Sequence, residues 1–170
     1  DGINQIKKSF IHRGKNRVIL PEKSSQIFDP ISQNRINCMP STLLDENVCG
    51  IKWVSVFPTN ASKNIENVNG ITLLSEIKTG QPIAIVNSTW LTKFRTAGVA
   101  ALASEYLAKK DSKAIGFIGA GEEAKMHLEV FKHMHPSIKE CRVSSRTHKS
   151  CVKFVEALSK KYEDINFTIC

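Results

Sequence analysis

The stretch Ala114-Ile-Gly-Phe-Ile-Gly-Ala-Gly-Glu-Glu-Ala124 decides the fold of this chain. Its first five residues form a short apolar run, which is typical of a buried β-strand, and two glycines follow directly. A helix-like segment then extends to about His133, and a second strand-like run follows at Cys141-Arg142-Val143. The order strand, glycine turn, helix and strand is the one that binds the pyrophosphate of a dinucleotide.

Each small residue of this turn has a separate physical task. The first glycine, Gly119, makes the tight turn, and Gly121 lets the backbone approach the phosphates. Ala124 is small enough for the helix to pack closely on its strand, and backbone N–H groups at the helix start face the anion. We therefore expect the whole run to contact a cofactor: Gly119, Ala120, Gly121, Glu122, Glu123 and Ala124.

Two acidic residues, Glu122 and Glu123, stand at the start of this helix. Carboxylates are favourable at a helix N-terminus, where the helix dipole is positive. They would nevertheless compete with a pyrophosphate for the same amides. We expect at least one of the two side chains to point away from the turn.

The composition is that of a globular protein with one ordinary or two small domains. The chain has 170 residues, of which 41% are hydrophobic and 24% charged. No apolar run approaches the roughly 20 residues of a membrane span, and the opening residues Asp1–Asn4 do not resemble a secretory leader. The five cysteines include no CxxC pair, which favours reduced thiols over a metal site. We expect a cytoplasmic protein without a membrane partner.

Positive charge and histidines raise two further possibilities. The net charge of +8 is compatible with nucleic-acid binding, but the lysines and arginines are scattered without interleaved aromatic residues. We interpret most of them as solvated surface and expect no nucleic-acid partner. His127, His133 and His135 do not share one helical face, and we assign them to the end of a helix and its loop rather than to a metal.

The residues before position 111 predict a mixture of helices and antiparallel strands. Their elements are expected to be a helix at 2–13 closed by Gly14, strands at 35–39 and 50–57, a polar surface loop at 59–70, a hairpin of 71–74 and 82–86 turning at Gly80, and a helix at about 89–109. Several small residues in the long helix indicate that another element packs closely against it.

The pattern changes at Asp111-Ser112 to β-α-β-α-β, with a last strand at 166–169. Dinucleotide-binding folds have six parallel strands in two halves, and one half fits here. The predicted fold class is therefore α/β, with an N-terminal α+β domain at 1–111 and the first half of a Rossmann domain at 112–170.

Four motifs together resemble the ornithine cyclodeaminase/mu-crystallin family. They are Gly50-Ile-Lys-Trp-Val-Ser-Val-Phe-Pro-Thr-Asn60, Thr79-Gly-Gln-Pro82, Leu91-Thr-Lys-Phe-Arg-Thr-Ala97 and Gly116-Phe-Ile-Gly-Ala-Gly121. Within the family, Asn34-Arg-Ile-Asn-Cys-Met-Pro40 followed by Ile51-Lys-Trp53 is similar to dehydrogenases of the 2,3-diaminopropionate pathway in siderophore biosynthesis.

The resemblance implies a homodimer in which residues 1–111 supply substrate contacts and the dimerisation sheet, and residues 112–170 begin the NAD(P)-binding domain. It also implies an oxidoreductase that passes a hydride between the amine-bearing carbon of an amino acid, or its imine, and a nicotinamide. The substrate would be ornithine by the broad match and a glutamate–diaminopropionate conjugate by the narrow one. The alternatives are a non-catalytic NADPH-binding regulatory protein of the mu-crystallin type and an inactive fragment.

Three basic residues are substrate-binding candidates. Lys52 lies among apolar residues, where an ammonium is costly without an anion, and the resemblance assigns it to the substrate carboxylate or the imine carbon. The alternative is an edge-strand lysine that reaches solvent. Arg95 offers a bidentate fork for a carboxylate, with an ion pair to Glu76 as the alternative. Lys23 falls near a substrate-contacting arginine of the family.

Lys52 and Arg95 are also the catalytic candidates, and the resemblance places Thr96 against the cofactor. The family's proton-accepting aspartate belongs to the second half of the dinucleotide domain, and no acid in residues 1–170 matches it. We therefore expect this chain to hold much of the substrate site and the ADP side of the cofactor site.

The residues after the second predicted strand bear on the choice of cofactor. NAD-binding folds carry an acid here for the ribose 2′-hydroxyl, whereas this chain has Ser145, Arg146 and Thr147. Hydroxyls and a guanidinium accept a 2′-phosphate, so NADP(H) is expected as the preferred cofactor and NAD(H) as the alternative. In the competing interpretation, Thr147 caps the next helix and Arg146 is solvated.

Overall fold

Two units make up the computed structural model, which describes residues 1–63 and 65–170. One unit comprises Asn4–Thr92 and contains an antiparallel sheet, and the other comprises Asp1–Ile3 with Lys93–Cys170 and contains a parallel sheet. The predicted mixture of helices, antiparallel strands and a β-α-β-α-β segment is confirmed. The domain boundary between residues 111 and 112 stays a prediction.

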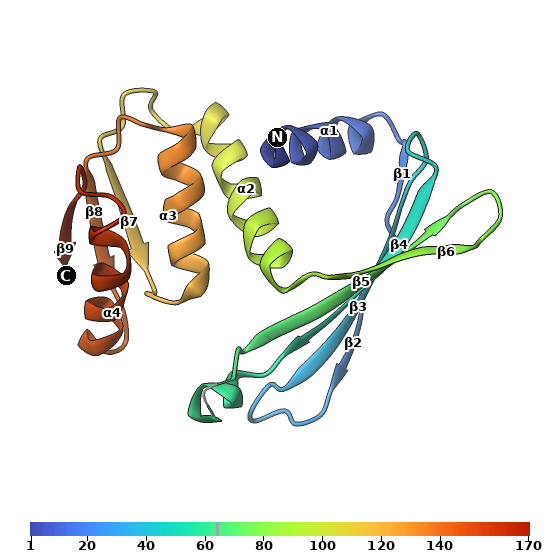
Figure 1. Ribbon diagram of the computed structural model, residues 1–170, viewed down its shortest axis with the longest axis horizontal. Coiled ribbons are helices and arrows are strands. Elements are labelled where there is room, and N and C mark those ends of the chain that lie inside the picture. The colour runs from blue at the N-terminus through green and yellow to red at the C-terminus, as the bar shows by residue number, and fades with distance from the viewer. Residues whose placement is uncertain (64) are drawn as a thin grey trace. The chain divides into compact units, whose positions relative to one another are not determined.

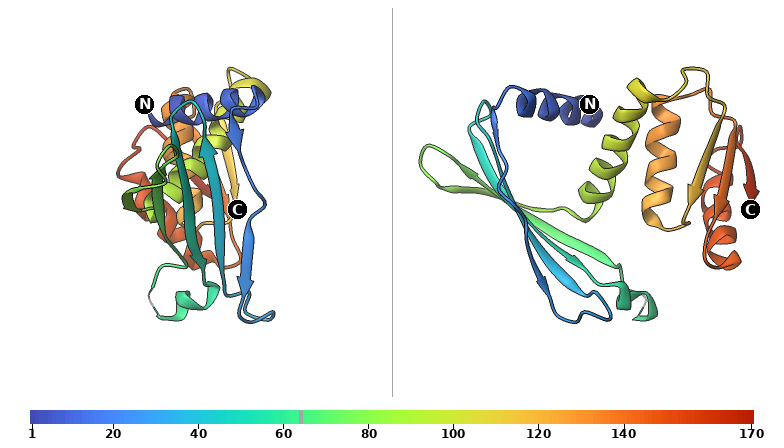
Figure 2. Two further views of the ribbon diagram at one scale, coloured as in Figure 1. Left: turned by 90° about the vertical axis from the view of Figure 1, so that its right-hand side faces the viewer. Right: turned by 180° about the vertical axis from the view of Figure 1, so that it is seen from behind.

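The antiparallel sheet has six strands in the order β1-β3-β4-β5-β6, and β2 also pairs with β3 (Figures 1 and 2). The elements of this part of the chain are α1 (Gly2–Gly14), β1 (Val18–Ile19), β2 (Ser24–Ile27), β3 (Arg35–Leu43), β4 (Val48–Val56), the 3₁₀ helix η1 (Pro58–Lys63), β5 (Val68–Glu76) and β6 (Pro82–Asn87). The strands β3, β4 and β5 are the longest of the chain, and β4 lies inside the sheet with a neighbour on each side.

Strand β3 does not stop at Pro40 as the sequence pattern predicted, but continues to Leu43. Proline lacks an N–H and is tolerated in a strand where no neighbour needs that hydrogen bond. Strand β2 pairs with β3 only up to Cys38, and β1 pairs only from Thr42. Pro40 lies between these two pairings, where the outer edge of β3 has no strand beside it.

The predicted loop at 59–70 differs from the structure at both ends, and residue 64 within it lies outside the described residues. Its first residues form η1, and β5 begins at Val68, opposite Val56. Asn69 takes part in the ladder opposite Ser55 although asparagine disfavours strands. Pairing with β4 therefore overrides the local composition.

The predicted hairpin of β5 and β6 is confirmed, and so is the prediction that it turns at Gly80. Gly80 has φ +73°, a backbone conformation that side chains with a Cβ rarely adopt, and its N–H donates to the carbonyl of Glu76 over 2.9 Å. The turn thus closes in the way that the sequence predicted.

The second unit contains three parallel strands in the order β7-β8-β9, with their helices alongside (Figure 1). Its elements are α2 (Thr89–Leu107), β7 (Ala114–Ile118), α3 (Glu122–Met134), β8 (Glu140–Ser144), α4 (His148–Ser159) and β9 (Asn166–Ile169). The first four residues of α2 group with the antiparallel unit and the remainder with the parallel one.

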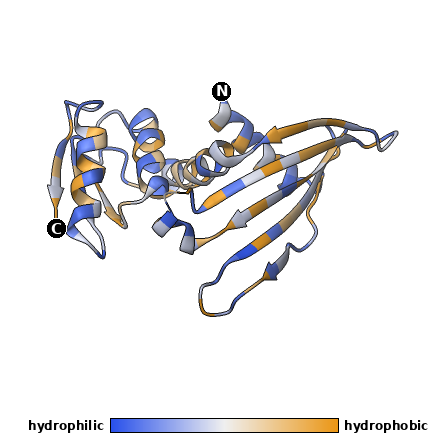
Figure 3. Ribbon diagram, turned by 60° about the horizontal axis from the view of Figure 1, so that its bottom comes forward, coloured by the Kyte–Doolittle hydropathy of each residue, from blue (hydrophilic) through white to orange (hydrophobic). Residues whose placement is uncertain are grey.

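One hydrophobic core joins α3 and α4 to one face of the parallel sheet. The buried members of this core are Leu128, Cys141, Val143, Cys151, Phe154, Leu158 and Ile165. Figure 3 shows apolar and polar residues alternating around α4, as expected for a helix that buries one side. A second cluster places Ala97 and Ala101 of α2 against Val130 of α3, so the small residues of α2 do permit close packing.

Within residues 1–63 and 65–170, no helix combines the length and the apolarity needed to cross a bilayer.

Candidate functional site

The glycine turn joins the end of β7 to the start of α3. Gly119 has φ +112°, and its N–H donates to the carbonyl of Ser144 over 2.7 Å, which ties the turn to the end of β8. Gly121 is the N-cap residue of α3, and no side chain caps the helix there. The amides of the first helical turn are consequently left for an anion.

The two alanines of this motif meet the packing requirement that the sequence indicated. Ala120 and Ala124 both pack against the core formed by α3, α4 and the parallel sheet. A larger side chain at either position would push α3 away from β7 and displace the turn.

An open pocket of about 410 Å³ lies beside the turn. It is lined by Ile118, Gly119, Ser144, Ser145, Arg146, Thr147 and Ser150. The structure thus brings the glycine turn together with the three residues predicted to select the cofactor. Sequence reasoning missed three lining residues, but the ends of β7 and β8 identify Ile118 and Ser144, and Ser150 follows from helical spacing after Thr147.

Thr147 is the N-cap of α4. Its Oγ1 accepts a hydrogen bond from the N–H of Ser150 over 3.4 Å and lies 2.7 Å from the Ser150 hydroxyl. The capping role considered for Thr147 is therefore present, and it leaves the residue in the wall of the pocket. Arg146 is exposed beside it.

The two glutamates at the start of α3 lie near basic side chains of their own helix. A carboxylate oxygen of Glu122 is 2.8 Å from the ammonium of Lys125, and one of Glu123 is 3.9 Å from Nδ1 of His127. Neither glutamate lines the pocket. Both carboxylates thus have a basic partner on α3 itself.

Lys52 lies in the middle of β4, opposite Met39 of β3 and Thr72 of β5. The alternative of an edge-strand lysine is wrong, because β4 is an interior strand. Lys52 is half-buried on one face of this sheet.

Lys23 is exposed and directly precedes β2. The ladder of β2 with β3 begins at Ser24, which pairs with Cys38, so Lys23 lies just outside the paired residues. Its role in substrate binding stays a prediction.

Arg95 and Thr96 lie in the second turn of α2, where Arg95 is exposed and Thr96 is half-buried. Glu76, the ion-pair partner considered for Arg95, accepts hydrogen bonds from the amide of Asn47 and the hydroxyl of Thr79. The exposure of Arg95 and the hydrogen bonds of Glu76 do not test the role of Arg95, so its binding of a substrate carboxylate stays a prediction.

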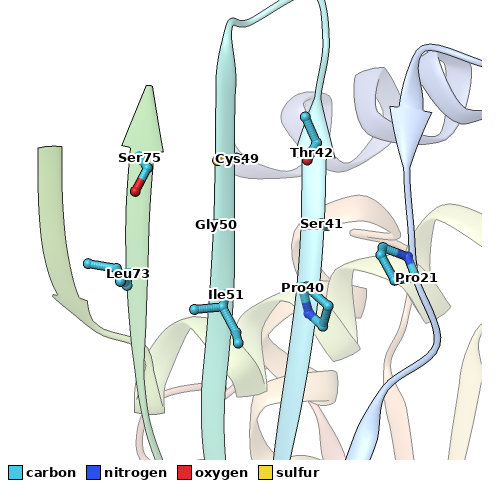
Figure 4. A pocket seen from close by; sticks show the side chains of 9 residues that line it. All are labelled: Pro21, Pro40, Ser41, Thr42, Cys49, Gly50, Ile51, Leu73 and Ser75. Carbon is cyan, nitrogen blue, oxygen red and sulfur yellow. The ribbon is translucent and has the colours of Figure 1, made fainter. Parts of the chain in front are cut away.

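A second hollow, of about 280 Å³, lies on the face of the antiparallel sheet opposite to the face that carries Lys52 (Figure 4). Pro40, Ile51 and Leu73 form a row across its floor, since Ile51 pairs with both of the others. Side chains alternate between faces along a strand, so Ile51 and Lys52 point to opposite sides. This apolar hollow is not the site around Lys52.

In the described part of the chain, no three His, Cys, Asp or Glu residues gather as metal ligands would. His135, which follows α3, instead lies with Nε2 2.6 Å from the hydroxyl of Ser104 in α2. Its contact joins the two helices.

The model of the ornithine cyclodeaminase/mu-crystallin family matches residues 3–170. The chain belongs to this family. Among family relatives, N-((2S)-2-amino-2-carboxyethyl)-L-glutamate dehydrogenase of Staphylococcus aureus is 32% identical over 170 residues, which cover 97% of this chain and 51% of that protein.

Solved structures of relatives share the fold. The Δ1-pyrroline-2-carboxylate reductase of Thermococcus litoralis, in complex with NADH and L-proline, superposes with a TM-score of 0.92 at 31% identity, over 99% of this chain and 51% of that one. An archaeal alanine dehydrogenase dimer with bound NAD gives a TM-score of 0.87 at 27% identity, over 99% and 50% of the respective chains. The chain spans about half the length of the relatives it matches.

Proposed function

We propose that this protein is an NAD(P)-dependent oxidoreductase that acts on the C–N bond of an amino acid or of its imine. The observation that carries the proposal is the pocket in which the glycine turn meets Ser145, Arg146 and Thr147. The family relatives support it, because their solved structures hold NADH with L-proline or NAD.

The residues present fit a dinucleotide. The uncapped start of α3 offers free amides for a pyrophosphate, and Gly119 and Gly121 keep side chains out of its path. Ser145, Arg146 and Thr147 would hold the adenosine ribose at the end of β8. When bound, the nicotinamide supplies the hydride-exchanging group, and the protein's own part is to orient it.

We further propose NADP(H) as the preferred cofactor. Strand β8 ends in Ser144 without an acid after it, and the guanidinium of Arg146 lies at the pocket, where it would pair with a 2′-phosphate. The two solved relatives described above hold NADH or NAD, so the ratio of the two affinities is the property to measure.

On the substrate side, we assign Lys52 to binding the carboxylate or polarising the imine-forming carbon, with Lys23 as a second candidate cation. Arg95 is assigned to carboxylate binding and Thr96 to the cofactor on the family resemblance. Lys52 and Arg95 remain the catalytic candidates of this chain.

A homodimer is the proposed assembly, and the exposed apolar face of the antiparallel sheet is the surface proposed for it. Ile71, Ile83 and Ile85 are 48%, 59% and 73% exposed, and Trp53 on the same sheet is 41% exposed. Exposed apolar side chains gathered on one sheet favour protein–protein contact.

Fluorescence titrations with NADPH and NADH test the cofactor assignment. We expect saturable binding that favours NADPH, and about tenfold weaker NADPH binding in Arg146→Gln, because a charge-assisted contact to phosphate is lost. Arg142→Gln, an exposed arginine on β8 that pairs with Glu140 instead of lining the pocket, is the matched control. Equal loss in both variants would show a general charge effect and contradict the role of Arg146.

Turnover assays on the complete natural polypeptide, with amino acids and imines, separate an enzyme from a binding protein. We expect nicotinamide oxidation or reduction that Arg95→Ala and Lys52→Ala each abolish. Cofactor binding without any turnover, unaffected by Arg95→Ala, would favour the regulatory alternative.

A further inference from the structure

The sheet face that carries Lys52 also contains a nearly buried amide, Asn37, which is 7% exposed. Asn37 lies in β3 opposite Val54, and Lys52 is two residues from Val54 along β4. Residues two apart on a strand share a face, so Asn37 and Lys52 are diagonal neighbours, with Cα atoms about 7–8 Å apart. This distance suits two ends of one amino-acid ligand.

The orientation of this amide is set by Ser25 of β2. The Ser25 hydroxyl donates to Oδ1 of Asn37 over 2.7 Å, and Ser25 itself is exposed at the outer side of the row. An amide oxygen that is occupied in this way leaves the Nδ2 group as the part that can meet a ligand, and that group only donates hydrogen bonds.

The charges around Asn37 are positive. Arg35 pairs with Val56 on the same face as Asn37 and Lys52. Four successive cross-strand rows on this face include no carboxylate among their paired residues. The rows are Ile27, Arg35, Val56, Val68; Ser25, Asn37, Val54, Gly70; Met39, Lys52, Thr72, Val86; and Ser41, Gly50, Leu74, Ala84.

The next paired row of this face contains a carboxylate that is engaged elsewhere. Glu76 pairs with Val48, one row beyond the end of these four, and it accepts hydrogen bonds from Asn47 and Thr79. A cationic substrate group placed between Lys52 and Asn37 would therefore meet an ammonium and a donor amide, an arrangement that disfavours it.

We infer that Asn37 is a specificity-determining residue that selects substrates with a carboxylate or carbonyl group on the side chain and disfavours diamino acids such as ornithine and lysine. The inference rests on the proposed function, since it names the substrate class of the same site. Lys52 holds one acceptor group of the substrate, and Nδ2 of Asn37 donates to a second one.

The test compares kcat/KM of the complete natural polypeptide for L-glutamate, L-norvaline and L-ornithine, with NAD⁺ and NADP⁺. We expect glutamate to be preferred over ornithine by about tenfold or more, because wrongly paired polar groups discriminate strongly. Asn37→Asp should raise the ornithine-to-glutamate ratio by about tenfold or more, since it adds a carboxylate beside the ligand. Asn166→Asp, the same change at an exposed position of β9, should leave the ratio unaltered.

A second variant guards against misfolding of Asn37→Asp. Ser25→Ala keeps the amide but removes the hydroxyl that orients it, and should reduce discrimination several-fold. A purely structural role for Asn37 would change the melting temperature and the rates for all substrates together, leaving the ratios constant, and would overturn the inference.

The remaining outcomes are separable. No turnover of any amino acid or imine, including conjugated ones, defeats the proposed function itself. Turnover that prefers ornithine, with ratios unchanged in Asn37→Asp, defeats only the assignment of Asn37.

Discussion

The antiparallel and parallel sheets of this chain differ most in what they bury. Of the buried hydrophobic side chains in residues 1–63 and 65–170, Val54 alone lies in Asn4–Thr92, whereas the others lie in Lys93–Cys170. The parallel sheet packs one face against α3 and α4. The antiparallel sheet keeps apolar residues such as Ile71 and Ile85 exposed. The parallel unit is therefore stabilised by a core of its own, whereas the antiparallel unit leaves more of its apolar surface exposed.

Phe154→Ala is expected to have the largest effect, and it tests whether the parallel unit is stabilised by its own core. Phe154 is fully buried, with its ring centroid 5.8 Å from that of Phe117 and 6.4 Å from that of Phe167. Removing a core phenylalanine leaves a cavity and costs about 3–5 kcal/mol of the free energy of unfolding. Leu107→Ala, at a position 85% exposed, is the control and should change stability by less than about 0.5 kcal/mol.

Urea unfolding followed by two probes locates this effect. Both tryptophans, Trp53 and Trp90, lie in Asn4–Thr92, so tryptophan fluorescence reports the antiparallel unit while circular dichroism reports both units. We expect Phe154→Ala to shift the dichroism transition and to leave the fluorescence transition in place. Coincident shifts of both would show that the two units unfold as one.

The next prediction concerns the turn at the edge of the parallel sheet. Gly119→Ala puts a Cβ at φ +112°, where strain costs about 1–3 kcal/mol, and places a methyl group beside the path of the pyrophosphate. We expect at least about tenfold weaker NADPH binding in a fluorescence titration. Gly116→Ala in β7 adds the same methyl group where no atom lies within 4 Å and should bind normally. Unchanged binding in Gly119→Ala would contradict the assignment of the turn.

The two sheets also differ in how far the sequence predicts them. The strands β7, β8 and β9 follow from apolar runs and from the glycines, because a parallel βαβ unit is encoded by local patterns. In the antiparallel sheet, the strands β1 and β2 are too short to give a periodic signal in the sequence. Strand β3 continues through Pro40 because no strand lies beside its outer edge at that residue.

The same distinction applies to the candidate sites. Gly119, Gly121 and Arg146 could be found from a motif, since each has a fixed place in the order of strand, glycine turn, helix and strand. The proximity of Asn37 to Lys52 could not, because it depends on a register of pairs such as Asn37 with Val54. A slip of one residue would turn Asn37 to the opposite face. Cross-strand register is a tertiary property that no window of sequence contains.

The smallest expected effect is a pH dependence confined to the parallel unit. The ammonium groups of Lys132 and Lys139 lie 2.8 and 2.7 Å from Oδ2 of Asp164, and Lys132 also donates to the carbonyls of Pro136 and Ile138. The hydrogen bond from Lys132, followed by that from Lys139, lowers the pKa of Asp164 from its ordinary value of 3.8 to about 2.

A depressed carboxyl pKa contributes stability above the unfolded value, and that contribution is lost as the pH falls from about 4 through 2. Asp164→Asn should flatten the pH dependence of the melting temperature in this window, with only a small change near neutral pH because the pair is at the surface. Glu163→Gln, its exposed neighbour, should keep the slope. If the slope persists in Asp164→Asn, the acid sensitivity arises elsewhere, and the loops before β8 and β9 do not depend on this carboxylate.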